Sequence, residues 1–154
     1  MSTDNDDVLK AIEALIPNSL DDIIQQHRDV ASLRLTTDME VMNLYAPIIP
    51  GQVKELINDW RFITFTLQFA DACATEIFLL GNRLSDGHAR ITSRVRKIDL
   101  DRGLVFTNSG SLYKLGSKGE GEPDQAQLFL VCAAFWKWGM GGYLGIMCIS
   151  SDLI

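Results

Sequence analysis

The chain has 154 residues, of which 47% are hydrophobic and 22% are charged, and its formal net charge is −6. This composition excludes an intrinsically disordered chain, and three cysteines are too few for a disulfide scaffold. We therefore predict one globular domain over residues 1–154. Cys73, Cys132 and Cys148 stand in apolar surroundings without CxxC spacing, and the first ten residues do not resemble a secretory signal. We expect buried thiols and a cytoplasmic location.

Charge is distributed unevenly along the chain. Residues 1–40 hold nine acidic and three basic side chains, a net charge of −6, whereas residues 83–118 hold eight basic and three acidic side chains, a net charge of +5. Such asymmetry can steer a charged partner toward the protein. Alternatively, the two regions face each other in the fold and cancel.

The acidic region is predicted to be helical. Apolar residues recur at helical spacing over residues 8–16, and Pro17 ends that segment. Ser19 should then cap a second helix, whose apolar stripe runs from Leu20 to Ala31 and includes His27. The acidic back of these helices is either an ordinary solvated face or a surface that docks a basic partner. The candidate docking residues are Asp21, Asp22, Asp29, Asp38 and Glu40.

The middle of the chain predicts a bend at residues 47–50 and a short helix over residues 52–60. In residues 61–69, apolar and polar side chains alternate with a period of two, which indicates a strand. A continuation of the preceding helix is the alternative. Residues 75–80 form another short apolar run, which ends at Gly81.

Residues 89–116 predict a β-meander of three antiparallel strands, with tight turns at Gly103 and Gly110. On the first strand, Arg90, Thr92, Arg94 and Arg96 should share one face, with successive arginines about 6.6 Å apart, near the spacing of phosphates. That face is either simply exposed or contacts nucleic acid, although the strand lacks interleaved aromatic residues for base stacking. The candidate nucleic-acid contacts are Arg90, Arg94, Arg96, Lys97 and Arg102.

The most apolar segment, residues 128–149, follows a short linker at residues 116–124. It is long enough to cross a membrane, but Lys137 and its glycines favour a buried helix followed by a strand over residues 143–149. Pro123 and Asp124 should open the helix, and Gly139 should end it. The glycines could instead let a ligand approach the backbone, and we expect at least one of the two tryptophans, 136 and 138, in the core.

Catalytic signatures are scarce. His88 follows Asp86 by two residues and could combine with Ser93 or Cys73 as nucleophile and base, and residues 99 and 101 form a carboxylate pair that could hold a divalent cation. No further motif supports either arrangement. We predict a protein that is not an enzyme and that has no cofactor and no metal site.

Taken together, these patterns predict an α+β fold with N-terminal helices, a central antiparallel β-meander and one buried C-terminal helix packed on the sheet. Small size, acidity and missing catalytic motifs favour a protein of the immunity or anti-defence type, which binds and inhibits another macromolecule through a charged surface. The expected partner is another protein with a basic surface. The alternatives are a nucleic-acid-binding accessory protein that uses the arginine strand and a membrane-associated protein that uses residues 128–149.

Overall fold

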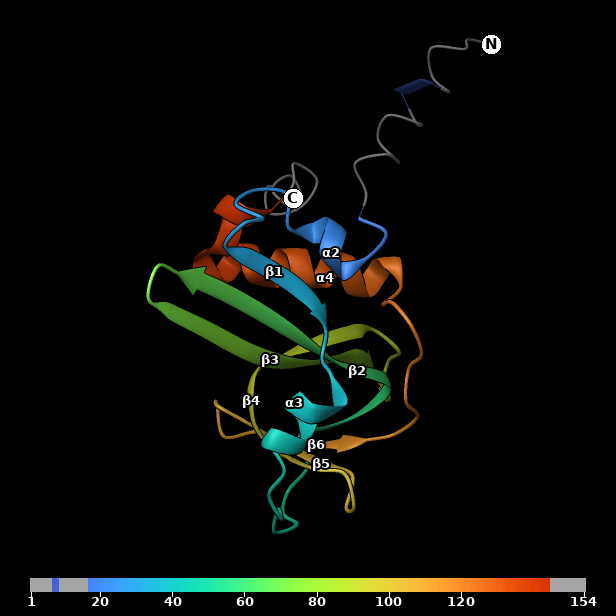
Figure 1. Ribbon diagram of the computed structural model, residues 1–154. Helices are drawn as coiled ribbons and strands as arrows, with labels where there is room; N and C mark the ends of the chain where they lie inside the picture. The colour runs from blue at the N-terminus through green and yellow to red at the C-terminus, as the bar shows by residue number, and fades with distance from the viewer. Residues whose placement is uncertain (1–6, 9–16, 145–154) are drawn as a thin grey trace, which may run out of the picture.

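The computed structural model describes residues 7–8 and 17–144, and it has the predicted α+β architecture (Figure 1). The described part contains six strands: β1 (Ala31–Leu35), β2 (Glu55–Phe69), β3 (Ala72–Arg83), β4 (Ala89–Asp99), β5 (Leu104–Thr107) and β6 (Leu112–Leu115). Its helices are α2 (Leu20–Ile23), α3 (Asp38–Asn43) and α4 (Gln125–Phe135), and α4 continues into a π-helical turn (Trp136–Met140) and a 3₁₀ turn (Gly141–Tyr143). The predicted antiparallel meander and C-terminal helix are both confirmed.

The sheet closes on itself. Each strand pairs antiparallel with the next, and β6 returns to pair with the start of β2 at residues 55–57. This last pairing is parallel because a meander of five strands, β2 to β6, ends in the direction in which it began. The result is a five-stranded barrel, with β1 added beside the outer half of β2.

A sharp bend in β2 separates these two parts of the sheet. The β2–β3 register shifts between Asn58 and Arg61, and Asp59 adopts a left-handed conformation with φ of 50°. Gly81 lies opposite this bend, where a Cβ atom would stand 2.7 Å from the carbonyl oxygen of Asn58. Only glycine lets the two strands approach so closely.

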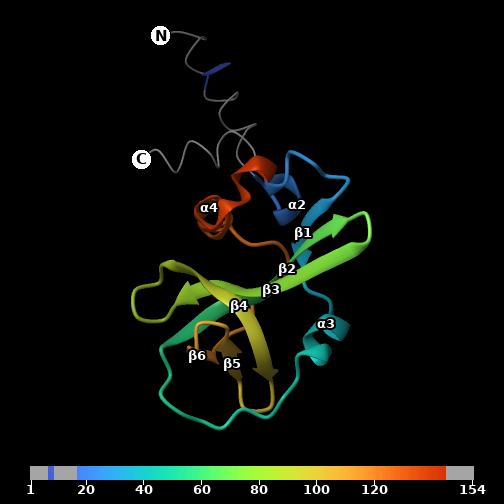
Figure 2. The same ribbon diagram turned by 90° about the vertical axis from the view of Figure 1, so that its left-hand side faces the viewer.

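The larger core lies between the sheet and the two helices that cover it, α2 and α4 (Figure 1), and Figure 2 looks nearly along α4 as it crosses the sheet. Phe135 is buried at its centre and meets Phe65 edge to face, with ring centroids 5.0 Å apart. Asp124 caps α4 in a capping box with Gln127, as predicted. The helix ends at Phe135 rather than at Gly139, which lies inside the π-helical turn with φ of 88°. Trp136 packs against this core, which agrees with the expectation for one of the two tryptophans.

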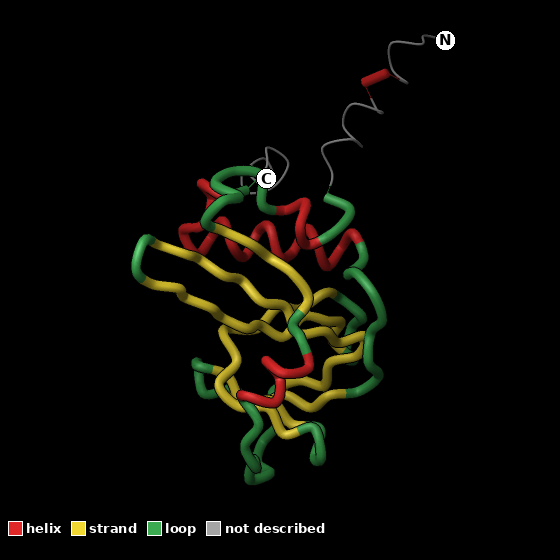
Figure 3. The backbone as a smooth tube through the Cα atoms, viewed as in Figure 1, coloured by secondary structure: helices red, strands yellow, loops and turns green. Residues whose placement is uncertain are grey.

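A second core fills the barrel and a third, smaller one lies under the loop that precedes β2. The barrel core comprises Ile57, Phe62, Ile77, Leu79, Val95, Ile98, Val105 and Tyr113. The smaller core comprises Ile48, Leu104 and Leu112. Figure 3 shows α2 and α4 at one end of the molecule with the strands below them, and α3 beside the lower part of the sheet.

Two predicted helices are wrong. Ser19 does cap α2 by accepting a hydrogen bond from the amide of Asp22, but the helix ends at Ile23 and the chain enters β1 at Ala31. His27 lies exposed in the intervening turn, with φ of 57°. Residues 55–60 belong to β2, because pairing with β3 and β6 outweighs their helical spacing. The strand prediction for residues 61–69 is confirmed, and the helical alternative is excluded.

The structure tests the terminal predictions only in part. Residues 7–8 are helical, and the rest of the first predicted helix lies outside the described residues. The predicted strand over residues 143–149 also lies outside them from residue 145 onward, and Leu144 forms one isolated bridge with Ile24. No helix in the described part of the chain combines the length and apolarity needed to cross a membrane.

Candidate functional site

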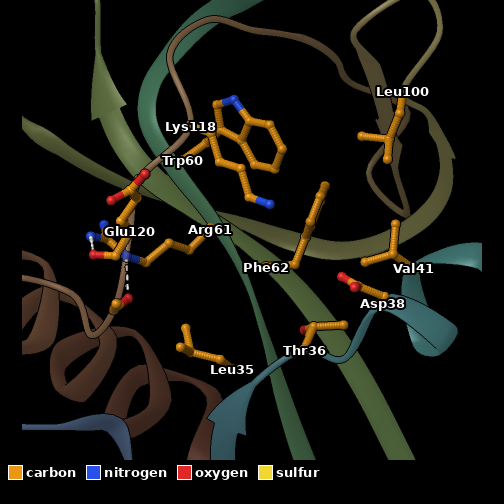
Figure 4. Close-up of a pocket in the computed structure, with 12 residues that line it drawn as sticks. Leu35, Thr36, Asp38, Val41, Trp60, Arg61, Phe62, Leu100, Lys118 and Glu120 are labelled. Carbon is orange, nitrogen blue, oxygen red and sulfur yellow. Dashed lines mark hydrogen bonds between the residues drawn. The ribbon is translucent and has the colours of Figure 1, made fainter.

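A cavity of about 350 Å³ opens between α3, the end of β1, the bend of β2 and the segment 118–121 (Figure 4). Its apolar walls are formed by Leu35, Val41, Trp60, Phe62 and Leu100. Ligand pockets in proteins usually measure about 300 to 1,000 Å³. The cavity therefore has room for a small molecule or for one large apolar side chain of a partner.

The two aromatic walls come from alternate positions on β2. Trp60 and Phe62 are two residues apart on the strand, and their rings meet edge to face with centroids 5.5 Å apart. The Trp60 indole nitrogen donates a hydrogen bond to the carbonyl of Gly116 at 3.0 Å, which fixes the ring orientation. The ammonium group of Lys118 stands 5.8 Å from the centroid of the same ring, within reach of a cation–π interaction.

The rim of the cavity carries both signs of charge. Asp38, on the first turn of α3, and Glu120, on the opposite segment, are both exposed, as is Lys118. Figure 4 shows the Asp38 carboxylate and the Lys118 ammonium group on different sides of the cavity. Of the described residues, two acidic groups and one basic group stand at this rim. The Arg61 guanidinium below the rim forms its hydrogen bonds with other groups of the protein.

Arg61 holds the segment 119–121 in place and does not serve as a free binding group. Its side chain is 8% exposed, and it donates to the carbonyls of Glu120 and Gly121, both at 2.7 Å. It also donates to the Asp59 carboxylate at 3.0 Å and to Gln127 of the α4 capping box at 3.1 Å. The guanidinium thus joins the wall of this cavity to the start of α4.

Helix α3 borders the cavity and buries none of its side chains. Its capping box pairs Thr37 with Glu40, and Arg34 binds the Glu40 carboxylate at 2.7 Å. This hydrogen bond from Arg34 is the main reason that the pKa of Glu40 falls to about 2. Met39 and Met42 are 73% and 65% exposed. A flexible apolar surface therefore lies beside the cavity.

The predicted acidic docking face is divided between two ends of the molecule. Helices α2 and α3 lie at opposite ends of β1, so their acidic groups cannot form one surface (Figure 1). Asp21 pairs with Arg28 at 2.7 Å, and Asp22 accepts a hydrogen bond from the amide of residue 18. Asp29 lies exposed in the turn before β1. Of the five predicted residues, only Asp38 lines the cavity.

The structure does not bring the predicted arginine face on β4 together as one continuous surface. The register of β4 shifts twice, between its pairs with Phe78 and Leu80 of β3 and again between Val95 and Lys97. Each shift reverses the alternation of side chains, so Thr92 is buried whereas Arg94 is exposed. A one-residue bulge of this kind leaves no clear signal in the sequence.

Of the candidate basic residues, Arg94 and Arg96 meet at the side-chain oxygen of Asn108, whereas Arg90 and Arg102 have environments of their own. Arg90 donates to the Tyr113 hydroxyl at 3.0 Å, Arg94 binds the Glu76 carboxylate at 3.1 Å, and Arg102 binds the buried Asp99 at 3.0 Å. Arg96 and Lys97 are exposed. Nucleic-acid binding by these residues stays a prediction.

The residues considered for catalysis are not brought together. The His88 side chain is 81% exposed, with its Nδ1 atom 3.7 Å from Asp86, whereas Cys73 lies at the other end of β3. The Ser93 hydroxyl donates instead to Ser109. Within the described ranges, no group of three or more histidine, cysteine, aspartate or glutamate residues could hold a metal ion.

The pair of carboxylates at residues 99 and 101 also serves the local structure. Asp99 is buried, and the hydrogen bond from the amide of Ile48 is the main reason that its pKa is lowered. Asp101 accepts a hydrogen bond from the Tyr45 hydroxyl at 3.0 Å. The two carboxylates therefore hold the loop before β2 against the β4–β5 turn.

The cysteines differ from the prediction of buried thiols. Cys73 is a free, exposed cysteine near the tip of the β2–β3 hairpin. Cys132 is buried on α4 and is disulfide-bonded. Cys148 lies outside the described residues.

The sequence reasoning missed most of this site. Trp60 was assigned to a helix, α3 was not predicted, and Lys118 and Glu120 were assigned to a linker. The alternation of Trp60 with Phe62 was the one available signal.

Comparisons with protein-family models, with curated proteins and with solved structures find no match to this chain.

Proposed function

We propose that this is a non-enzymatic binding protein that captures another protein with a basic surface, and that an apolar side chain of the partner anchors in the α3 cavity. One observation carries the proposal: a helix without any buried side chain exposes two methionines beside an apolar cavity of about 350 Å³. Amphipathic helices on a domain surface normally turn an apolar face to the core.

The apolar part of this surface has the character of a protein-binding site. Leu100, at 46% exposure, adds to Met39 and Met42 around a cavity walled by Trp60 and Phe62. Interfaces concentrate their binding energy on a few anchors that enter such cavities, and methionine-rich surfaces adapt to varied partners. A small metabolite would gain nothing from the methionines outside the cavity.

The charges favour a basic partner. Asp38 and Glu120 stand at the rim, Lys118 is held near the Trp60 ring, and the whole chain carries a net charge of −6. Complementary charge at a rim mainly raises the association rate, and salt weakens it. Inhibition follows if the anchored segment belongs to the partner's own functional site, which is how a protein of the immunity type would act.

Affinity capture with matched variants tests this proposal. Wild-type protein and the site variants Met42→Glu and Asp38→Lys are each immobilised on a resin and incubated with a native extract of the source cells. Asp29→Lys makes the same change of charge on an exposed residue at the α2 end. We expect one basic protein to be retained by the wild type and by Asp29→Lys, and to be lost with both site variants. Equal loss from Asp29→Lys, or no loss from either site variant, contradicts the proposal.

The cytoplasmic location belongs to the same proposal, and Cys132 offers its test. Disulfides are rare in cytosolic proteins. Thiols are therefore blocked with N-ethylmaleimide during lysis under denaturing conditions, and the modified cysteines are mapped by mass spectrometry. Blocking of Cys132 would show that its disulfide is reduced in the cell, as a cytoplasmic location requires, whereas an unblocked Cys132 would contradict that location.

A further inference from the structure

A second cavity, of about 280 Å³, lies between the end of α4 and the sheet, and it shares no lining residue with the α3 cavity. One side is aromatic and is formed by Phe78, Phe135 and Trp138. The other side is polar and is formed by Glu76, Ser93, Arg94 and Asn108, and Arg96 stands beside it through its hydrogen bond to Asn108. These two chemically different sides face one open cavity, which suits a ligand with one apolar and one charged end.

The aromatic side offers a stacking surface. The ring of Trp138 lies nearly parallel to that of Phe78, with centroids 5.1 Å apart and planes inclined by 21°. Trp138 is nevertheless 40% exposed. It comes directly before Gly139, whose positive φ interrupts the π-helical turn. The chain thus presents this indole at the cavity mouth.

The polar side gathers positive charge. Arg94 and Arg96 both donate to the side-chain oxygen of Asn108, at 3.5 and 3.0 Å. Glu76 neutralises Arg94, but among the residues that the structure describes no carboxylate pairs with Arg96. The Ser93 hydroxyl lies within the same group and bonds to Ser109 at 3.1 Å. Guanidinium and hydroxyl groups are the usual donors to carboxylates and phosphates.

We propose that this second cavity binds a small planar aromatic anion. Its ring packs against Trp138 and Phe78, and its carboxylate or phosphate approaches Arg94 and Arg96. The volume lies just below the usual range of about 300 to 1,000 Å³, which limits the ligand to one or two fused rings. Glu76 cancels the charge of Arg94, so among the described residues Arg96 supplies the one uncompensated positive charge beside the cavity, which favours an anion over a neutral aromatic molecule. This proposal does not depend on protein capture by the α3 cavity.

Titration by NMR tests the site with four probes, and the readout is the indole N–H signal of Trp138, assigned with Trp138→Phe. The probes are 2-naphthoate, 2-naphthyl phosphate, the uncharged 2-naphthamide and the non-aromatic cyclohexanecarboxylate. We expect a saturable shift with one or both aromatic acids, and the tighter of the two identifies the anionic group. The amide and the non-aromatic acid should each bind at least about tenfold more weakly.

Two variants complete the test. Arg96→Gln should weaken the aromatic acid about tenfold and leave the amide unaffected, because only the charged end meets this residue. Arg28→Gln, which changes an exposed arginine paired with Asp21, should change neither. The dispersion of the amide spectrum reports that each variant is folded. No saturable shift with either acid up to about 10 mM, equal binding of the amide, or unchanged binding by Arg96→Gln overturns the proposal.

Discussion

The two longer helices begin with the same capping motif but differ in how many side chains they bury. Both α3 and α4 start with a complete capping box, Thr37 with Glu40 and Asp124 with Gln127. Helix α4 buries five side chains against the sheet, whereas α3 buries none and exposes Met39 and Met42. Capping determines where a helix begins, but only tertiary contacts determine which of its side chains are buried. Helix α3, whose Val41 alone packs against the barrel core, is the one available to a partner.

The largest expected effect comes from truncating the buried helix. Phe135→Ala removes a ring that packs against Phe65 and Phe78, and it should cost about 4 kcal/mol of unfolding free energy. Met42→Ala on α3 should change the unfolding free energy by less than about 0.5 kcal/mol. Urea denaturation followed by circular dichroism measures both. A comparable loss from Met42→Ala would remove the contrast between the helices.

A second prediction concerns the connection between the two regions. Arg61→Met should cost about 3 kcal/mol, because it leaves Gln127 and the carbonyls of Glu120 and Gly121 without their donor. The exposed Arg28→Met serves as the control and should cost less than about 1 kcal/mol. Denaturant midpoints distinguish the two variants. Equal midpoints would mean that the buried guanidinium does not join the cavity wall to α4.

The smallest effect concerns the pH dependence of α3. Because the folded pKa of Glu40 is lowered to about 2 from its ordinary 4.5, its stabilising contribution is complete above the ordinary pKa. That contribution is lost as the pH falls through the folded value. Glu40→Gln should therefore lower stability by about 1 kcal/mol at neutral pH and reduce the decline in Tm between about pH 5 and pH 2.

Removing the partner of Glu40 provides the matched control. Arg34→Gln should flatten the same acid decline, since Arg34 is the main cause of the low pKa of Glu40. Thermal melts at a series of pH values measure both variants. An acid decline in either variant as steep as that of the wild type would contradict the assigned role of this pair.

The sequence predicted those elements whose signal is local. Strand β2 over residues 61–69, the meander with turns at Gly103 and Gly110, and the start of α4 at Asp124 all follow from periodicity, turn residues or capping. Helix α2 was overextended because residues 24–31 fit a helical stripe as well as they fit a turn and a strand. Pairing of β1 with β2 decides between them.

The α3 cavity could not be predicted because its walls come from distant parts of the chain. Leu35, Trp60, Leu100 and Lys118 meet only after β2 bends and β6 closes the barrel. The arginine face is formed only in part for a related reason, since two register shifts interrupt the alternation of side chains in β4, and of its arginines only Arg94 and Arg96 meet, at Asn108. Neither the bend nor the shifts leave a periodic signal.

Site-specific photocrosslinking asks most simply whether α3 meets a partner. A benzophenone amino acid replaces Met42 in one variant and Leu84 in a control variant. Leu84 is 60% exposed and lies on the β3–β4 turn, across the barrel from α3 (Figure 2). After irradiation in a native extract of the source cells, we expect one discrete adduct with a basic protein from position 42 and none from position 84. The same adduct from both positions, or none from position 42, would contradict a docking role for α3.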